Sequence, residues 1–205
     1  AGPCRLRPMI DSDVARRAYE RELFRAARDT IRTLERDLGL SARAAAEIYA
    51  ATAALVPGGL ARHTRRRPQN ARAAFEVVKK FGRPADVDMP ELGIAGRLQK
   101  TKLSPRLGGL LGESGPRAAQ WLAERTGADV ETVGRAIAAT APVALGALER
   151  ALEPNDLSDW IATLPDVALT RPGELLEANA HPSRVYRRVR RLGQPFWIRL
   201  LGIEG

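Results

Sequence analysis

Residues 11–39 read DSDVARRAYERELFRAARDTIRTLERDLG, and the spacing of their apolar side chains decides the fold class. These side chains recur at steps of three and four residues, which places them on one face of an α-helix. They are Val14, Tyr19, Leu23, Phe24, Ala27, Ile31, Leu34 and Leu38. Asp11 or Ser12 is expected to cap this helix, and Gly39 to end it in a left-handed conformation. The stretch therefore predicts one long amphipathic helix.

The rest of the chain repeats this helical pattern between glycines and prolines. Further helices are expected from Ser41 to the Pro57-Gly58-Gly59 break, over 68–81, over 114–126, from a cap at Asp129 to Ala141, from Pro142 through Leu148, and over 156–164, 172–180 and 183–201. No segment of strand length alternates apolar and polar residues with a period of two. The chain is therefore predicted to be all-α.

The chain also aligns with itself after a shift of 88 residues. This shift places Ala50-Ala51-Thr52-Ala53 on Ala138-Ala139-Thr140-Ala141 and Gly39 on Gly127. Alanine-rich helices match by chance, but glycines in register at both ends favour a duplication. We expect two helix-turn-helix-like units, each ending in a proline or glycine break before a third short helix. Two such units would pack together and bury each other's apolar faces.

This repeat suggests how the chain is organised. Residues 1–10 are expected to be a disordered extension, in which Met9 is the first plausible start. The first helical unit is predicted over 11–82 and the second over 104–152, with a connector rich in proline and glycine at 83–103. A basic helical C-terminal segment is predicted to occupy 153–205.

Two stretches of the second unit carry a family resemblance. Leu122-Ala123-Glu124-Arg125-Thr126-Gly127, followed by Val133 and then by Ala141-Pro142-Val143-Ala144-Leu145-Gly146-Ala147-Leu148, resembles the repeat of the YidB-like bacterial family. Leu107-Gly108-Gly109-Leu110-Leu111-Gly112 resembles it too, and the similarity covers about residues 20–152. In the first copy Pro57 lies three positions later than the repeat register requires. The resemblance implies an all-helical fold with a homeodomain-like arrangement of helices. It implies no particular activity, because the family has no settled biochemical activity.

Ala123, Gly127 and Val133 have the spacing of a helix-turn-helix, which would make 129–137 a recognition helix. A helical hairpin that does not bind DNA would need the same small and β-branched residues at these positions, so it is the alternative interpretation. Residues 111–180 hold five bases and eleven acids, and the candidate helix begins Asp129-Val130-Glu131. These carboxylates would repel phosphates, so the hairpin is favoured.

Positive charge gathers elsewhere. The chain has a net charge of +9, with +8 over residues 61–110 and +5 over 181–205. The first cluster comprises Arg62, Arg65, Arg66, Arg67, Arg72, Lys79 and Lys80, and the second Arg184, Arg187, Arg188, Arg190 and Arg191. Tyr186, Phe196 and Trp197 lie among or after the second set, as a surface that stacks on bases would require. A solvated basic face beside core aromatics is the alternative.

Several classes of function have no support in the sequence. There is one cysteine, the two histidines are 118 positions apart, and no phosphate-binding glycine loop or dinucleotide fingerprint occurs. Helix surfaces and caps explain the acids at Glu149, Glu153, Asp156 and Asp159 better than a cation site does. The longest largely apolar run, 50–56, is too short to span a bilayer, and no secretory signal is recognised. We expect a cytoplasmic bacterial protein that is not an enzyme and that holds no metal or cofactor.

The leading hypothesis is binding of nucleic acid, DNA rather than RNA, through backbone phosphates and with little base readout. The alternative is a protein-interaction or scaffold module. In that case Phe196 and Trp197 would dock on a partner, and the arginines would meet an acidic protein. Attachment to a membrane surface by the same basic, aromatic tail is a weaker third hypothesis.

Overall fold

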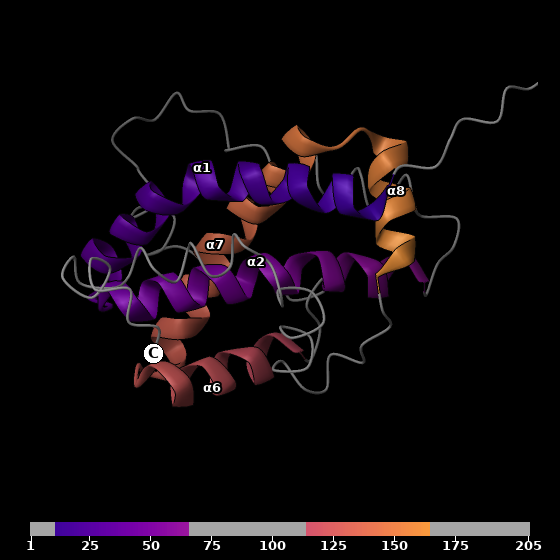
Figure 1. Cartoon of the computed structure of the whole chain (residues 1–205). Coiled ribbons are helices and arrows are strands. Elements are labelled where there is room, and N and C mark those ends of the chain that lie inside the picture. The colour runs from indigo at the N-terminus through magenta and orange to yellow at the C-terminus, as the bar shows by residue number, and fades with distance from the viewer. Residues whose placement is uncertain (1–10, 66–113, 165–205) are drawn as a thin grey trace, which may run out of the picture.

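The computed structural model describes residues 11–65 and 114–164, and these two ranges form five α-helices and no strand. Helices α1 (Ser12–Leu38) and α2 (Ala42–Arg65) come first, followed by α6 (Ser114–Thr126), α7 (Val130–Ala151) and α8 (Pro154–Thr163) (Figure 1). The all-α prediction is confirmed for this part of the chain. The extension at 1–10, the connector and the helices predicted over 68–81, 172–180 and 183–201 lie outside the described residues.

Local interactions begin three of these helices, α1, α2 and α7, and end two, α1 and α6, at the predicted places. The side chains of Asp11, Ser41 and Asp129 accept hydrogen bonds from backbone amides two, three and three residues later, at 2.8, 3.2 and 2.8 Å. Gly39 and Gly127 have φ angles of 64° and 71°, in the left-handed region where a Cβ is disfavoured. The predicted caps at Asp11 and Asp129 and the predicted left-handed conformation of Gly39 are confirmed.

The helix boundaries repeat at the spacing found in the sequence. Helix α1 ends at Leu38 and α6 at Thr126, while α2 begins at Ala42 and α7 at Val130. Both intervals equal the 88-residue shift of the sequence repeat. The order of helix, glycine turn and helix therefore recurs along the chain.

The breaks predicted at the two prolines are wrong. Helix α2 continues through Pro57 to Arg65, and α7 continues through Pro142 to Ala151. A proline inside a helix removes one hydrogen bond and costs about 3 kcal/mol in isolation. Both helices are surrounded by other helices, and this packing offsets the cost of the prolines. In α2 the hydroxyl of Tyr19 also donates to the carbonyl of Ala53, one turn before Pro57, at 2.8 Å.

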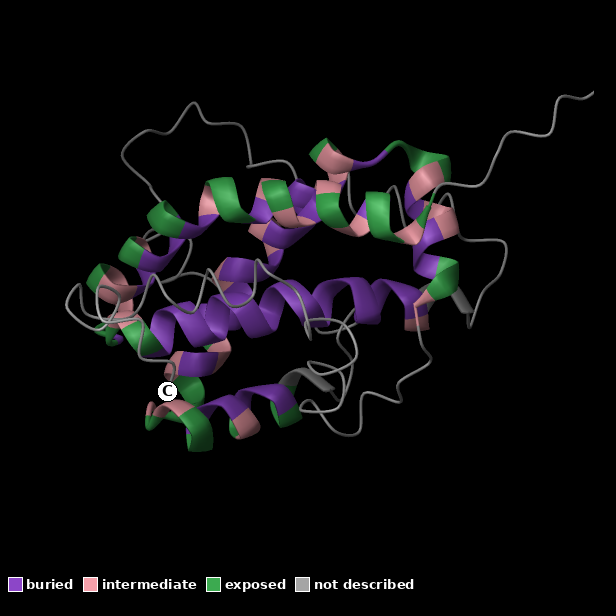
Figure 2. Cartoon of the chain, in the orientation of Figure 1, coloured by how far each residue is buried: buried purple, intermediate pink, exposed green. Residues whose placement is uncertain are grey.

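Helix α2 lies at the centre of the bundle. Every residue over 44–61 is buried, and α2 contacts α1, α6, α7 and α8 (Figure 2). By length and composition alone, Ala42–Arg62 is the one segment within the described ranges that could cross a membrane. The most apolar window of this segment is entirely buried among the other helices. Its hydropathy is therefore that of the core helix of this fold.

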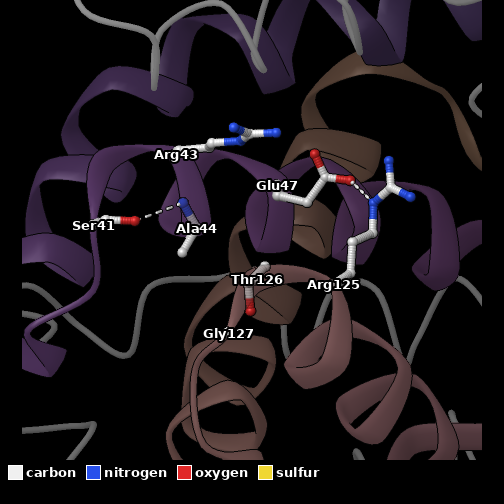
Figure 3. A pocket seen from close by; sticks show the side chains of 7 residues that line it. All are labelled: Ser41, Arg43, Ala44, Glu47, Arg125, Thr126 and Gly127. Atoms are coloured by element: carbon white, nitrogen blue, oxygen red, sulfur yellow. Dashed lines mark hydrogen bonds and ion pairs between the residues drawn. The ribbon is translucent and has the colours of Figure 1, made fainter. Parts of the chain in front are cut away.

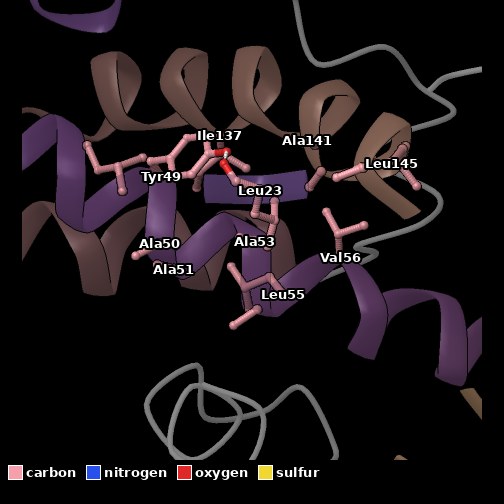
Figure 4. Close-up of a cluster of buried hydrophobic side chains, with 14 of the residues drawn as sticks. Leu23, Tyr49, Ala50, Ala51, Ala53, Leu55, Val56, Ile137, Ala141 and Leu145 are labelled. Carbon is pink, nitrogen blue, oxygen red and sulfur yellow. Dashed lines mark hydrogen bonds between the residues drawn. The ribbon is translucent and has the colours of Figure 1, made fainter. Parts of the chain in front are cut away.

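The core contains most of the side chains predicted for it. Leu122, Val133, Ile137 and Leu148 are buried, and so are Leu34, Ile48 and Leu55; Figure 4 shows how α2 and α7 meet there. Leu38 and Trp121 are only partly buried, and Val14 and Phe24, which the apolar spacing placed on the inner face of α1, are exposed instead. Leu38 is the last residue of α1, and the guanidinium of Arg125 lies 5.4 Å from the Trp121 ring centroid. Both side chains lie at the edge of the core.

Helix α8 closes one end of the bundle, across the start of α1 (Figure 1). Its buried side chains are Leu157, Trp160 and Ile161. The Trp160 ring meets that of Tyr19 with centroids 5.6 Å apart and planes tilted by 52°. Aromatic pairs favour such offset geometry over parallel stacking. The helix predicted over 156–164 is thus present, beginning two residues earlier and ending one residue earlier.

Candidate nucleic-acid interface

The two predicted basic clusters lie almost entirely outside the described residues. Arg62 is half-buried near the end of α2, and Arg65 is the last residue of that helix. The structure describes no other member of either cluster, nor the two docking aromatics. Those residues are Arg66, Arg67, Arg72, Lys79, Lys80, Arg184, Arg187, Arg188, Arg190, Arg191, Phe196 and Trp197. The structure therefore does not test whether these residues come together.

The described helices are nearly balanced in charge. Residues 11–65 and 114–164 contain 14 arginines, no lysine and 15 acidic residues, a net charge of −1. Because the whole chain carries +9, the remaining residues carry a net charge of +10. The surplus of positive charge is therefore carried by segments outside the helical bundle that the structure describes.

The predicted recognition helix is the start of α7, and its packing leaves an acidic surface. Val133 and Ile137 are buried, while Asp129, Val130 and Glu131 are exposed. Hydrogen bonds from the side chain and backbone of Thr132 lower the pKa of Asp129, so this carboxylate stays charged. Glu131 forms an ion pair with Arg135, one turn later. The exposed start of α7 therefore presents carboxylates where a DNA-reading helix would need groups that attract phosphates.

A row of arginines runs along the outer face of α1. Six arginines follow one another at steps of three and four residues, and all six are exposed. At 1.5 Å per residue the row is about 28 Å long. It lies opposite the buried side of α1, which carries Tyr19, Leu23, Ile31 and Leu34. We call it the α1 arginine row; its members are Arg17, Arg21, Arg25, Arg28, Arg32 and Arg36.

The members of the row differ in their partners. Arg25 pairs with Glu22, Arg36 pairs with Asp37 at 2.7 Å, and the Nε of Arg17 donates to the backbone carbonyl of Asp13 at 3.1 Å. The other three members have no hydrogen bond or ion pair in the structure; they are Arg21, Arg28 and Arg32. Half of the row is therefore free to bind an external anion.

The spacing of the row is unfavourable for the helix itself. Four pairs of its arginines are separated by four residues: 17 and 21, 21 and 25, 28 and 32, and 32 and 36. Like charges at this spacing destabilise a helix by roughly 0.2–0.5 kcal/mol per pair. Natural sequences tend to break local rules of this kind at functional sites. The net charge of the N-terminal stretch conceals the row, because the acids on the flanks of α1 offset the arginines on its face.

A hollow of about 540 Å³ lies between the start of α2 and the end of α6 (Figure 3). Glu47 lines it with a side chain only 6% exposed, and the Nε of Arg125 donates to its Oε1 at 2.7 Å. The remaining lining residues are Ser41, Arg43, Ala44, Thr126 and Gly127. Glu47 and Arg125 neutralise each other. We therefore interpret their ion pair as a structural joint between the helix pair α1–α2 and the helix pair α6–α7. Nothing in the local sequence links these two residues, which are 78 positions apart.

Within residues 11–65 and 114–164, no three His, Cys, Asp or Glu side chains lie close enough together to hold a metal ion. The acidic residues around the end of α7 and the start of α8, which are Glu149, Glu153, Asp156 and Asp159, lie within these ranges and form no such group.

Comparison with known proteins identifies one family. The model of the family described as "Bacterial protein of unknown function (DUF937)" matches residues 22–151. This match covers α1 from its first third, α2, α6 and the whole of α7. No curated protein and no solved structure shows significant similarity to the chain.

Proposed function

Because this chain belongs to DUF937, a bacterial family of unknown function, its role must be argued from its own residues, and we propose that it is a non-catalytic protein that binds nucleic acid through backbone phosphates. The observation that carries this proposal is the partition of charge. Described helices of net charge −1 are joined to segments of net charge +10, which contain both basic clusters except Arg62 and Arg65. Such a segregated field attracts polyanions at long range. Contacts of this kind give affinity with little sequence preference.

DNA is the favoured partner over RNA, and the cytoplasm the favoured location. An acidic protein that meets the arginines, with Phe196 and Trp197 as the docking residues, is the second candidate. The free arginines on α1 support an anionic partner, because guanidinium groups bind phosphate and carboxylate oxygens in a bidentate manner.

The same proposal includes the origin of the bundle. The 88-residue interval between equivalent helix ends supports a duplication of one helix-turn-helix-like unit, as in the YidB-like repeat. In this view the hairpin at Gly127 is a packing element, because its outer surface is acidic. An experimental structure in which α1 with α2 and α6 with α7 fail to superpose would contradict the duplication.

A salt titration of the full chain with labelled DNA and RNA tests the binding proposal. Replacing Arg187, Arg188, Arg190 and Arg191 with alanine should weaken binding to every sequence. On duplex DNA it should flatten the dependence of log affinity on log salt by about 0.9 per lost phosphate contact. Replacing Arg65, Arg66, Arg67 and Arg72 tests the other cluster in the same way.

The matched control removes four arginines that belong neither to a basic cluster nor to the α1 arginine row: Arg16, Arg117, Arg135 and Arg150. It changes net charge equally and should alter the salt dependence much less. No binding of the parent protein to DNA or RNA at about 50 mM salt would defeat the proposal. An acidic protein partner would then become the leading candidate.

A further inference from the structure

The α1 arginine row is a strongly charged surface that neither basic cluster includes. It is exposed along its whole length, and the opposite side of α1 is anchored in the core by Tyr19, Leu23 and Leu34. A row held on a helix of 27 residues keeps its charges at set positions. A site on a rigid element pays less ordering entropy on binding than one on a flexible segment does.

We infer that the α1 arginine row is a contact surface for the sugar-phosphate backbone of nucleic acid, with Arg21, Arg28 and Arg32 as its phosphate-binding residues. This inference rests on the proposed function and extends it from the basic clusters to the helical bundle. The three guanidinium groups are exposed and have no partner within the protein. Binding phosphates would also relieve the repulsion between arginines four positions apart.

The chemistry of the row favours nucleic acid over a membrane surface. A helix that lies on a membrane needs a broad apolar face to bury among the lipids. The apolar face of α1 is already occupied by the core, and the largest exposed apolar side chains near the row are Val14, 50% exposed, and Phe24, 38% exposed. A single row of guanidinium groups about 28 Å long instead matches an extended line of phosphates.

The test replaces Arg21, Arg28 and Arg32 with glutamine in the full chain, since glutamine has a similar helix propensity. Affinity for duplex DNA at about 0.1 M salt should fall by about tenfold or more, and the slope against log salt should flatten by up to about 2.7. The melting temperature should not fall, because no hydrogen bond or ion pair within the protein is lost. A purely structural role for the row would instead lower it.

The matched control replaces Arg117, Arg135 and Arg150 with glutamine, which removes the same charge from α6 and α7. These arginines are not on α1, so the slope of log affinity for DNA against log salt should stay close to that of the parent protein. Equal flattening in both triple variants would overturn the inference, because it would show an effect of net charge alone. Unchanged binding in the Arg21, Arg28 and Arg32 variant would overturn it as well.

Two further arms separate this inference from the proposed function. If the variant at Arg187, Arg188, Arg190 and Arg191 loses affinity while the α1 variant does not, the proposed function stands and the α1 surface is rejected. If the parent protein binds neither DNA nor RNA, both are rejected. If the α1 variant loses binding only to vesicles of phosphatidylcholine and phosphatidylserine, the row is a membrane contact and the inference is wrong.

Discussion

The hydroxyl of Tyr19 in α1 donates a hydrogen bond to the backbone carbonyl of Ala53 in α2, at 2.8 Å. In a regular helix this carbonyl would accept from the amide four residues later, which here belongs to Pro57 and does not exist. Tyr19 therefore supplies the hydrogen bond that Pro57 removes. The two residues are far apart in sequence, so the central helix continues through its proline with the help of a neighbouring helix.

Replacing Tyr19 with phenylalanine should lower the free energy of unfolding by about 1–3 kcal/mol, because the buried carbonyl of Ala53 loses its partner. In a Pro57→Ala background the loss should be smaller, since the amide of residue 57 then serves that carbonyl. Urea titrations of the four proteins in this double-mutant cycle measure the coupling.

Tyr49→Phe is the matched control for this cycle. Its hydroxyl donates to the carbonyl of Leu23 at 2.7 Å, but that carbonyl lies inside a regular stretch of α1 and keeps its helical partner. The loss should be about 1 kcal/mol and independent of Pro57. Equal coupling of both tyrosines to Pro57 would show that the assignment of Tyr19 is wrong.

Stability should fall at alkaline pH because of the same two tyrosines. Burial raises the pKa of Tyr19 and of Tyr49 well above the ordinary value of 10.0. The unfolded chain loses these protons near pH 10 while the folded chain keeps them. The stabilisation is thus complete below pH 10 and is lost as pH rises beyond it, by up to about 1.4 kcal/mol per pH unit for each tyrosine. The free energy of unfolding should differ less between about pH 9 and about pH 11 in the Tyr19→Phe, Tyr49→Phe double variant than in the parent protein.

Substitutions of three glycines by alanine should separate backbone conformation from packing. A Cβ at Gly39, Gly127 or Gly134 would have no atom within 4 Å, so crowding contributes nothing at any of them. Gly39→Ala and Gly127→Ala should each cost about 1 kcal/mol because their φ angles are positive. Gly134→Ala, inside α7, should stabilise the protein by about 0.4–1 kcal/mol. Thermal melts followed by circular dichroism would measure all three, and a loss at Gly134 would contradict this reasoning.

Breaking the joint between the helix pairs should cost more than breaking a surface ion pair. Arg125→Gln leaves the buried carboxylate of Glu47 without this cation. The expected loss is about 2 kcal/mol, less than for a fully buried pair because the Arg125 side chain is 46% exposed. Arg135→Gln removes an exposed pair with Glu131 and should cost about 0.5 kcal/mol or less. Chemical denaturation of both variants makes the comparison, and equal losses would show that the joint is not stabilised by this pair.

The sequence by itself determined where the helices begin and where the turns lie. Asp11, Ser41 and Asp129 cap helices through hydrogen bonds to amides two or three residues away, and Gly39 and Gly127 end helices through their own backbone freedom. These effects are local, so short stretches of sequence contain them. The apolar periodicity of α1 likewise predicted most of its buried face, but it wrongly included Val14 and Phe24, which are exposed.

Only the tertiary structure decided the features that depend on distant residues. Helix α2 continues through Pro57 because Tyr19 and the surrounding helices compensate for the lost hydrogen bond, and Glu47 meets Arg125 across 78 positions. The arginine row is visible in the spacing of the sequence, but the structure showed which face of α1 is exposed and that Arg21, Arg28 and Arg32 have no partner. Burial and pairing are properties of the packed chain, because each is decided by which other helices surround a side chain.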